Sequence, residues 1–590
     1  MAIIHLSGTK LAPRKAKAPL NRKFMYSVGF VFLIAMHLYI PNLGGAGLAL
    51  PFNISTWLSL SYVIAIGLFH MAKTRQVRYS KLSIVLFITC IFLTIPIFYP
   101  LHNDWTSFLP RLIAVWSGWF FFLILQQFLL SNQHKQRLLW FIVIATAMQT
   151  ILSYLQLFSL LPKDIIGYND FTQLPFGVFQ QSSVMVSFLS TGVILSGYLL
   201  ARQQRKYGQR ISRTLFLYVL PIFTVPQLFL LSQGLEWIGA AIGFLFVVVY
   251  LYRFSTPQRL AGWVALSVAG AGLGLILFST IGGSISNSDT PEISKTMLFP
   301  QTIDMLVEKP FTGYGYGQIE TAYALYTARQ HQLNPNYPAG YGPLQHPQNE
   351  ILYWGIEGGI IPILGLIFSS AMVLFKIYSA RKGTRLAIFS LFIPIIIHSQ
   401  IGMPFYLSAI HWLILIILLY WVDQRTSKYR IVSFSTISSI ALKNVALIVP
   451  LVTTTCMGLA LQANFTLYRF DKSYPKDTAI LSQVMVPFSE TIEFNWQLRS
   501  NLLKQGLVNK DEDLITQYIN WSVIAIKNAP KEKYYRHLIL AYLGLGEISK
   551  AEQIRSEASF LFPNNDFSML DIEPIIKPTK TEQDTINIDK

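Results

Sequence analysis

A histidine and two carboxylates stand close together at the point where a polar stretch of the sequence meets an apolar one. Glu350 and Glu357 are seven residues apart, which is about two helical turns, so on a helix they share one face. His346 precedes them by about one turn, and Pro347 favours a helix start directly after it. An imidazole can exchange a proton near neutral pH, and a carboxylate can orient it. The spacing therefore indicates acid–base chemistry, with a capped helix and a hydrogen-bonded histidine as the structural alternative.

The composition places these residues in a membrane protein. The chain has 590 residues, of which 52% are hydrophobic and 13% charged, whereas a soluble domain has about 25% charged residues. Its net charge of +18 is compatible with nucleic-acid binding only if Lys and Arg cluster on one soluble face. They lie instead in short runs between apolar stretches. We therefore expect a lipid bilayer, and no nucleic acid, as the partner.

Thirteen apolar stretches are long enough to cross a bilayer as helices. The weakest assignment concerns five polar residues, 232–236, which separate two apolar runs. A hairpin and one long buried segment are both compatible with that pattern, and we favour the hairpin. The predicted spans are 25–40, 55–72, 82–99, 111–130, 138–161, 184–201, 214–231, 237–252, 260–281, 350–378, 386–401, 407–422 and 443–463.

The positions of Lys and Arg give these spans an orientation. Alternate connecting segments on one side hold 26 basic residues, and those on the other side, without the C-terminal tail, hold five. Short loops rich in Lys and Arg stay in the cytoplasm. The sequence thus predicts a cytoplasmic N-terminus and an outer C-terminus. The two cysteines, Cys90 and Cys456, both lie in predicted spans and offer no cysteine-based metal site.

The expected fold is an all-α polytopic membrane protein with about 13 transmembrane helices, a large periplasmic loop and a helical C-terminal domain. In the tail, apolar residues at helical spacing on both sides of Gly546 end at Pro563, which predicts a tetratricopeptide-like hairpin. A small helical cap is a simpler reading of it than a peptide-binding groove. The predicted parts are a basic N-terminus (1–24), helices 1–9 (25–281), the loop (282–349), helices 10–13 (350–463) and the tail domain (464–590).

The motifs around the histidine resemble those of the O-antigen ligase superfamily. The resemblance rests on the run Pro310 to Gly317, on His346 to Glu350 and on Glu357-Gly358-Gly359. Further motifs are similar to those of bacterial protein O-oligosaccharyltransferases, in particular the pilin-glycosylating branch. They are Gly177 to Gln181, His398-Ser399-Gln400, Pro404-Phe405-Tyr406 and His411-Trp412.

The resemblance implies a multi-pass glycosyltransferase of the bacterial inner membrane. It would move a preassembled glycan from undecaprenyl pyrophosphate to a Ser or Thr hydroxyl of an exported protein such as a pilin, on the periplasmic side. No metal and no cofactor is expected. Two alternatives stay open. An O-antigen ligase or polymerase would use a sugar hydroxyl as acceptor, and a polytopic transporter or flippase would belong to another class, although transport favours polar groups at the bilayer midplane.

In such an enzyme His346 is the first candidate for the base, and a phosphate contact by its protonated form is the second. Glu350 or Glu357 would orient the histidine or the acceptor. Arg111 and Arg329 are candidates for holding the pyrophosphate, although Arg111 at a span end is also placed to snorkel and Arg329 to be a solvated loop charge. The other candidate substrate-binding residues are Gln180, Gln181, Tyr314, Tyr316, Asn349, His398 and His411.

Overall fold

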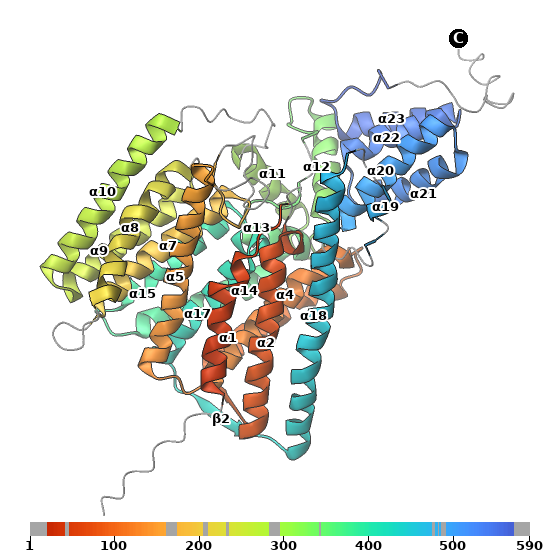
Figure 1. Cartoon of the computed structure of the whole chain (residues 1–590). Coiled ribbons are helices and arrows are strands. Elements are labelled where there is room, and N and C mark those ends of the chain that lie inside the picture. Colours follow the sequence, from red (N-terminus) through yellow and green to blue (C-terminus); the bar gives the residue numbers. More distant parts are fainter. Residues whose placement is uncertain are drawn as a thin grey trace, which may run out of the picture.

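Helices dominate the computed structural model, which describes residues 20–41, 46–160, 174–203, 211–231, 235–281, 295–341, 344–474, 478–481, 483–484 and 491–570. Long helices form one bundle, and a group of shorter helices sits at one end of it (Figure 1). Ten helices in the described ranges are long and apolar enough to cross a membrane, and Arg385–Ile401 is a shorter apolar one. The prediction of an all-α polytopic membrane protein is confirmed.

Each of the thirteen predicted spans contains a helix. The weak pair at 232–236 forms two helices, with 232–234 outside the described residues. Helix α1 has 13 residues because a 3-10 turn, η1 (Ala35–His37), follows it. The spans correspond to α1 (Asn21–Leu33), α2 (Pro51–Thr74), α3 (Lys81–Thr94), α4 (Trp105–Gln127), α5 (Asn132–Leu157), α7 (Ser182–Ala201), α8 (Ile211–Leu231), α9 (Glu236–Phe254), α10 (Pro257–Ile281), α14 (Ile360–Ser379), α15 (Arg385–Ile401), α17 (Ala409–Thr426) and α18 (Thr436–Lys472).

Helix α7 forms the centre of the bundle. Every residue from Val184 to Leu200 is buried, and α5, α8, α9 and α15 all pack against it. Neighbouring helices therefore cover all the faces of α7. Polar side chains on α7, among them Ser187, are therefore enclosed by protein rather than by lipid.

The predicted span 350–378 is two helices, because the chain breaks at Gly359. Helix α13 (Glu350–Gly358) ends there and α14 begins at Ile360. Gly359 has φ +72°, and a Cβ at this position would lie 2.2 Å from the carbonyl oxygen of Phe311. Only glycine adopts this conformation with so close a neighbour. The break leaves α13 as a short helix that carries Glu350 and Glu357 at the head of α14.

Two short strands that the helical pattern did not predict join distant loops. Strand β1 (Gln76–Tyr79) pairs antiparallel with β2 (Arg430–Ser433), with Gln76 opposite Ser433. They follow the end of α2 and precede the start of α18. The pair fixes these two helix ends side by side, and α18 packs along α2.

The C-terminal helices pack in sequence order, as the tetratricopeptide-like pattern predicts. They are α19 (Thr478–Leu481), α20 (Thr491–Asn509), α21 (Glu512–Asn528), α22 (Glu532–Gly544) and α23 (Ile548–Leu561). Each of α20 to α23 packs against the next, and Gly546 turns the chain between the last two with φ +75°. This group lies at the end of α18, beside α12 (Figure 1).

The large loop contains two helices that connect the bundle to the C-terminal group. They are α11 (Lys295–Glu308) and α12 (Ile319–Leu333). Helix α12 touches both α21 and α23, and the Thr321 hydroxyl donates to the carbonyl of Asn528 at 2.7 Å. Lys531 and Glu320 form an ion pair at 3.7 Å. The two helices of the loop thus lie between the membrane helices and the C-terminal helices.

Candidate functional site

The N-terminus of α13 is hydrogen-bonded to the end of α15 and to the short segment that follows it. The Asn349 side chain caps α13 by accepting from the backbone of Leu352 at 3.0 Å, and its amide donates to the carbonyl of Gln400 at 3.0 Å. The Glu350 carboxylate accepts from the backbone N–H of Phe405, in the short helix α16 (Pro404–Leu407), at 3.3 Å. Asn349 therefore ties α13 to α15, and Glu350 ties it to α16.

The C-terminal end of α13 is held by the glycine-rich run 313–317. The backbone N–H of Tyr314 donates to the backbone carbonyl of Ile356 at 2.8 Å, and that of Gly315 donates to the backbone carbonyl of Glu357 at 3.0 Å. Gly315 has φ +102°, and a Cβ there would lie 2.4 Å from the carbonyl oxygen of His102. The run is therefore a close-fitting backbone clasp. It positions Glu357 rather than a nucleotide.

Arg111 of α4 and Glu357 of α13 form a buried ion pair. The second Glu357 oxygen accepts from the backbone N–H of Gly317 at 3.0 Å. Aromatic rings surround the guanidinium, with ring centres at 4.1 Å for Tyr353, 4.2 Å for Trp354 and 5.3 Å for Tyr316. The Nε and Nη1 atoms of Arg111 are buried and have no hydrogen-bond partner among the described residues. The arginine is thus anchored by one nitrogen, with two others unused.

His346 lies against aromatic rings, and two of them, Tyr406 and Tyr353, link it to this pair. Its ring centre is 5.5 Å from that of Tyr406, which is in turn 6.0 Å from that of Tyr353. Burial lowers the pKa of His346 from 6.5 to about 4, so the imidazole is neutral at pH 7. Its Nδ1 atom has no hydrogen-bond partner within the described ranges. The histidine can therefore accept a proton or a hydrogen bond.

Contacts link these residues into one group, which we call the α13 cluster: His346, Glu350, Tyr353, Trp354, Glu357, Arg111, Tyr316 and Tyr406. It combines a neutral imidazole, a buried cation with unused donors, two carboxylates and several aromatic faces. Cations hold developing negative charge most effectively where water is excluded. The arrangement is suited to removing a proton from a hydroxyl while an anionic group is held nearby.

Two predicted residues lie apart from the α13 cluster, around the exposed end of α11. Arg329 is exposed on α12, where its guanidinium is 3.9 Å from the carboxylate of Glu308. The Tyr314 ring lies 4.4 Å from the Lys309 ammonium. Burial, and next the neighbouring Glu308 carboxylate, raise the pKa of Tyr314. Arg329 and Tyr314 thus form a second charged group on the large loop, with Glu308 and Lys309.

His398 and His411 are joined through one serine of α7. His398 Nδ1 is 2.7 Å from the Ser187 hydroxyl, and that hydroxyl is 3.0 Å from His411 Nε2. The other His411 nitrogen is 2.9 Å from the hydroxyl of Ser408. Both histidines are buried. They form a hydrogen-bonded chain across α7, α15 and α17 rather than direct contacts with His346.

Gln180 and Gln181 lie at the entry to α7. Gln181 is the residue before the first helical turn, and Gln180 has φ +58°, an uncommon conformation for a side-chain-bearing residue. The Gln180 amide nitrogen is buried without a hydrogen-bond partner in the described part of the chain. Its amide is therefore available as a donor, as the sequence-based assignment to substrate requires.

Sequence reasoning assigned no role to Tyr353, Tyr406 or Ser187. Tyr353 follows Glu350 by three residues, so helical spacing alone places the two on adjacent positions of one face. Ser187 is a polar residue inside a predicted span, which is itself a signal of function or packing. The position of Tyr406 against His346 depends on how α16 folds back, and nothing in the local pattern indicates it.

The C-terminal third of the chain matches a known family. Residues 386–573 match the family model described as virulence factor membrane-bound polymerase, C-terminal. The match fits the O-antigen ligase and polymerase superfamily. No curated protein matches the chain.

The matched range includes His398, Tyr406 and His411 and extends through α18 to the C-terminal helices. His346, Glu350, Glu357 and Arg111 lie before it. The match supports a membrane-bound ligase-like or polymerase-like glycosyltransferase. It contributes nothing on the roles of the residues on α4 and α13, which rest on geometry alone.

Proposed function

We propose that this protein is a membrane glycosyltransferase that moves a preassembled glycan from undecaprenyl pyrophosphate to a Ser or Thr hydroxyl of an exported protein such as a pilin. The observation that carries the proposal is the α13 cluster, in which aromatic rings link a neutral histidine to an arginine paired with a buried carboxylate, at the head of an apolar helix. The family match of residues 386–573 supports the same class of chemistry.

In this reaction the acceptor oxygen attacks the anomeric carbon, and the bond from that carbon to the pyrophosphate oxygen breaks. His346 takes the proton of the attacking hydroxyl, since its imidazole is neutral at pH 7 and has a nitrogen without a partner among the described residues. Tyr406 packs edge-on against the imidazole, with ring centres 5.5 Å apart, and limits its rotation. The lipid pyrophosphate leaves as the anion.

Arg111 is the first candidate for holding that anion. Its Nε and Nη1 atoms are unused by the described residues, and Glu357 fixes the remaining nitrogen. A guanidinium can bind two phosphate oxygens at once. Arg329 and Lys309, which are exposed on the large loop, are second candidates. They would contact the pyrophosphate of the donor before it reaches the α13 cluster. Glu350 orients the α16 segment that carries Tyr406.

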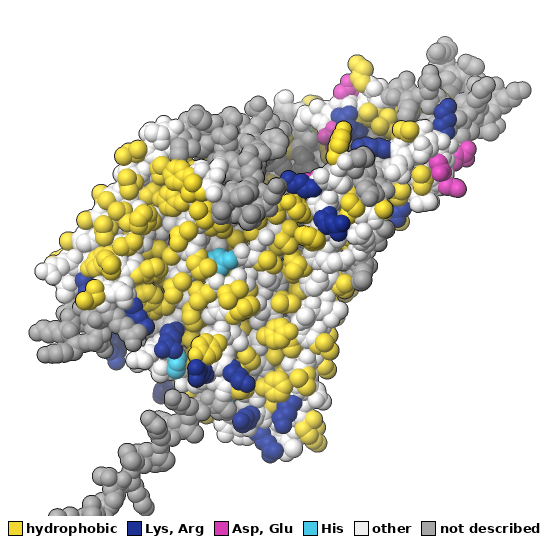
Figure 2. All heavy atoms as spheres, viewed as in Figure 1, with side chains coloured by type: hydrophobic (Ala, Val, Ile, Leu, Met, Phe, Trp, Pro, Cys, Tyr) yellow, Lys and Arg dark blue, Asp and Glu magenta, His cyan; other side chains and the backbone are white. Residues whose placement is uncertain are grey.

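The distribution of charges supports a proposal for the side of the membrane on which the cluster lies. On the face in Figure 2, dark blue Lys and Arg side chains gather at the lower end of the bundle, while magenta carboxylates appear near the C-terminal helices at the upper end. We propose that the lower end is cytoplasmic, that the α13 cluster and the C-terminal helices are periplasmic, and that the membrane is the bacterial inner membrane. There the cluster meets lipid-linked glycans and exported acceptors.

A polymerase or O-antigen ligase is the second candidate function. The description of the matching family, a membrane-bound polymerase, favours it. The chemistry at His346 and Arg111 would be the same, and the acceptor would be a sugar hydroxyl instead of a protein hydroxyl. The two functions differ in where the transferred glycan is found.

Intact mass spectrometry of a co-expressed, exported pilin tests the proposal. With the wild-type protein and a lipid-linked glycan supplied by the host, we expect a pilin mass increased by one glycan. With His346→Ala the increase should disappear, although the variant is present in the membrane at the wild-type level. His331→Ala is the matched control, because that histidine also belongs to the large loop but bonds only to the carbonyl of Tyr337 among the contacts described.

The alternatives give other results. Longer glycan chains on lipid, with unmodified pilin, would favour the polymerase. Glycosylated pilin in the presence of His346→Ala would contradict the role of this histidine.

A further inference from the structure

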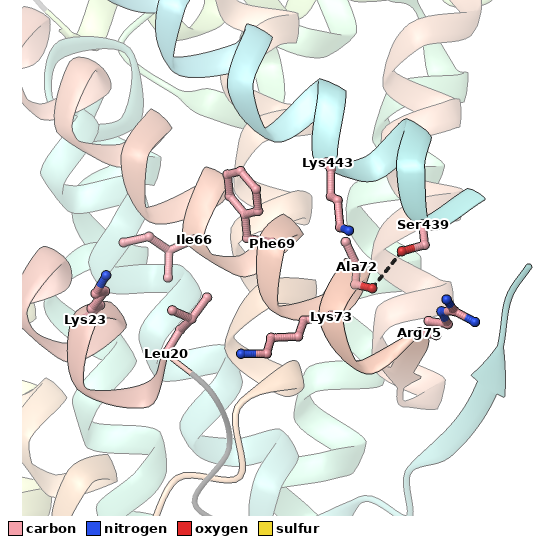
Figure 3. Close-up of a pocket in the computed structure, with 9 residues that line it drawn as sticks. All are labelled: Leu20, Lys23, Ile66, Phe69, Ala72, Lys73, Arg75, Ser439 and Lys443. Carbon is pink, nitrogen blue, oxygen red and sulfur yellow. Dashed lines mark hydrogen bonds between the residues drawn. The ribbon is translucent and has the colours of Figure 1, made fainter. Parts of the chain in front are cut away.

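A cavity of about 630 Å³ lies between α1, α2 and α18, at the end of the bundle away from the α13 cluster. Figure 3 shows the residues that line it, which come from the first turn of α1, the last turns of α2 and the first turns of α18. None of them belongs to the proposed transfer site. The cavity therefore requires an explanation of its own.

Every charged residue that lines this cavity is a cation. Lys23, Lys73, Arg75 and Lys443 contribute from three separate helices or their ends. All four side chains are exposed, and none of them forms an ion pair with any described residue. Four cations around one space create a positive potential that attracts an anion. The charge pattern thus calls for an anionic ligand.

The inner wall of the cavity is apolar. Leu20, Ile66 and Phe69 line it and are half-buried. Figure 3 shows Ile66 and Phe69 further from the C-terminal end of α2 than Lys73 and Arg75 are. A free inorganic anion would make no use of such a wall. A molecule with an anionic head and an acyl chain would contact both parts, because lipids at a bilayer surface present these groups in that order.

Hydrogen bonds join the helix ends that carry these cations. Arg75 ends α2 with φ +52°, a left-handed conformation, and its carbonyl accepts from the backbone N–H of Phe434 at 3.1 Å. The Ser439 hydroxyl of α18 donates to the carbonyl of Ala72 at 2.7 Å, the dashed line in Figure 3. Two helices are therefore joined at the rim of the cavity, with their cations on either side of it.

We propose that this cavity binds an anionic phospholipid of the surrounding bilayer, with the phosphate head between Lys73, Arg75 and Lys443 and an acyl chain along Ile66 and Phe69. The lipid bridges α2 and α18. The inference is independent of the proposed transfer reaction.

Native mass spectrometry of the full-length protein, released from nanodiscs of defined composition, tests the proposal. Nanodiscs with equal parts of phosphatidylglycerol and phosphatidylcholine should give protein that retains phosphatidylglycerol preferentially. Each cation near a membrane surface strengthens anionic-lipid binding about fivefold. The triple variant Lys73→Gln, Arg75→Gln, Lys443→Gln should therefore retain it about two orders of magnitude more weakly.

A matched triple variant controls for total charge. Arg381, Lys382 and Lys428 are also exposed and belong to loops at the same end of the bundle, outside the cavity. Replacing all three by Gln should lower lipid retention much less than the cavity triple variant does. If the cavity triple variant misfolds, the single variant Arg75→Gly removes one cation at a position where φ +52° suits glycine, and a fivefold loss is expected.

Three results would overturn the proposal. They are equal losses in both triple variants, equal retention of the anionic and the zwitterionic lipid by the wild type, and displacement of the retained lipid by millimolar inorganic phosphate. The last result would identify a site for a free anion.

Discussion

The cations at the two ends of the bundle occupy opposite environments. Arg111 is 11% exposed, paired with a carboxylate that is fully buried, and surrounded by three aromatic rings. Lys73, Arg75 and Lys443 are exposed around a cavity and form no ion pair with a described residue. The first cation is part of the protein's own interior, and the others are available to a ligand.

The difference teaches that the number of cations on a face does not decide which of them acts on an anion. A buried charge must be compensated, so the Arg111–Glu357 pair is needed for folding before it can serve a reaction. An exposed charge costs little and contributes little to folding. Substitutions of the Arg111–Glu357 pair should therefore mainly lower stability, and substitutions of the exposed cations should mainly weaken ligand binding.

The largest effect is expected from breaking the buried pair. Arg111→Met leaves the Glu357 carboxylate buried without its cation, which should lower the free energy of unfolding by about 3–5 kcal/mol. Thermal unfolding of the detergent-solubilised protein measures the loss. The double variant Arg111→Met, Glu357→Gln should recover most of the stability, because a neutral amide can still accept from Gly317.

The same double variant sharpens the distinction between folding and function. It should remain inactive in glycan transfer although it is stable, since the unused Nε and Nη1 donors are gone. Wild-type transfer by the double variant would show that the pair is structural only.

The second effect concerns the glycine that ends α13. Gly359→Ala places a Cβ 2.2 Å from a carbonyl oxygen at φ +72°, and we expect a loss of about 2 kcal/mol or more in stability. The matched control is Gly458→Ala in α18, where no atom lies within 4 Å of the added methyl group. That variant should be neutral or slightly stabilising. Equal unfolding temperatures for both variants would contradict the requirement for glycine at the break between α13 and α14.

The third effect is on the pH dependence of transfer. His346 must be unprotonated to act as a base, and its lowered pKa of about 4 extends the active range toward acid. At pH 5.5 a histidine with the ordinary pKa of 6.5 would be about nine-tenths protonated, and the rate would fall about tenfold. We expect initial rates at pH 5.5 and 7.5 to agree within a factor of about two. An acid limb with a midpoint near 6.5 would exclude His346 as a buried base.

The smallest effect is expected at the exposed cations. Lys73→Gln with Lys443→Gln should change the free energy of unfolding in detergent by no more than about 0.5 kcal/mol. Chemical denaturation of the variant and the wild type gives this difference. A loss comparable to that of Arg111→Met would remove the contrast between the two ends.

The sequence predicted the helices well because apolar length and Lys and Arg positions report directly on membrane crossing. It also placed His346, Glu350 and Glu357 close together at the start of one predicted span, since their spacing is local. The break at Gly359 was missed, because the apolar pattern continues through it and only the close approach of Phe311 requires glycine there.

Long-range pairing was beyond the sequence pattern. Arg111 and Glu357 are 246 positions apart, and no periodicity relates an arginine in one span to a carboxylate in another. The Ser187 link between His398 and His411 is of the same kind. Arg329 differs from Arg111 in this respect. Its position in the loop predicted a contact with the pyrophosphate, whereas in the structure it lies on α12 near Glu308.

The most direct test of the central claim is transfer by the purified protein. Protein in nanodiscs, undecaprenyl-pyrophosphate-linked glycan and a pilin acceptor are mixed, and the initial rate of glycan-bearing pilin is measured for the wild type and for His346→Ala. Loss of a general base lowers a rate by about 10² to 10⁴. We predict a loss in that range with an unchanged unfolding temperature, whereas a wild-type rate for His346→Ala would contradict the account.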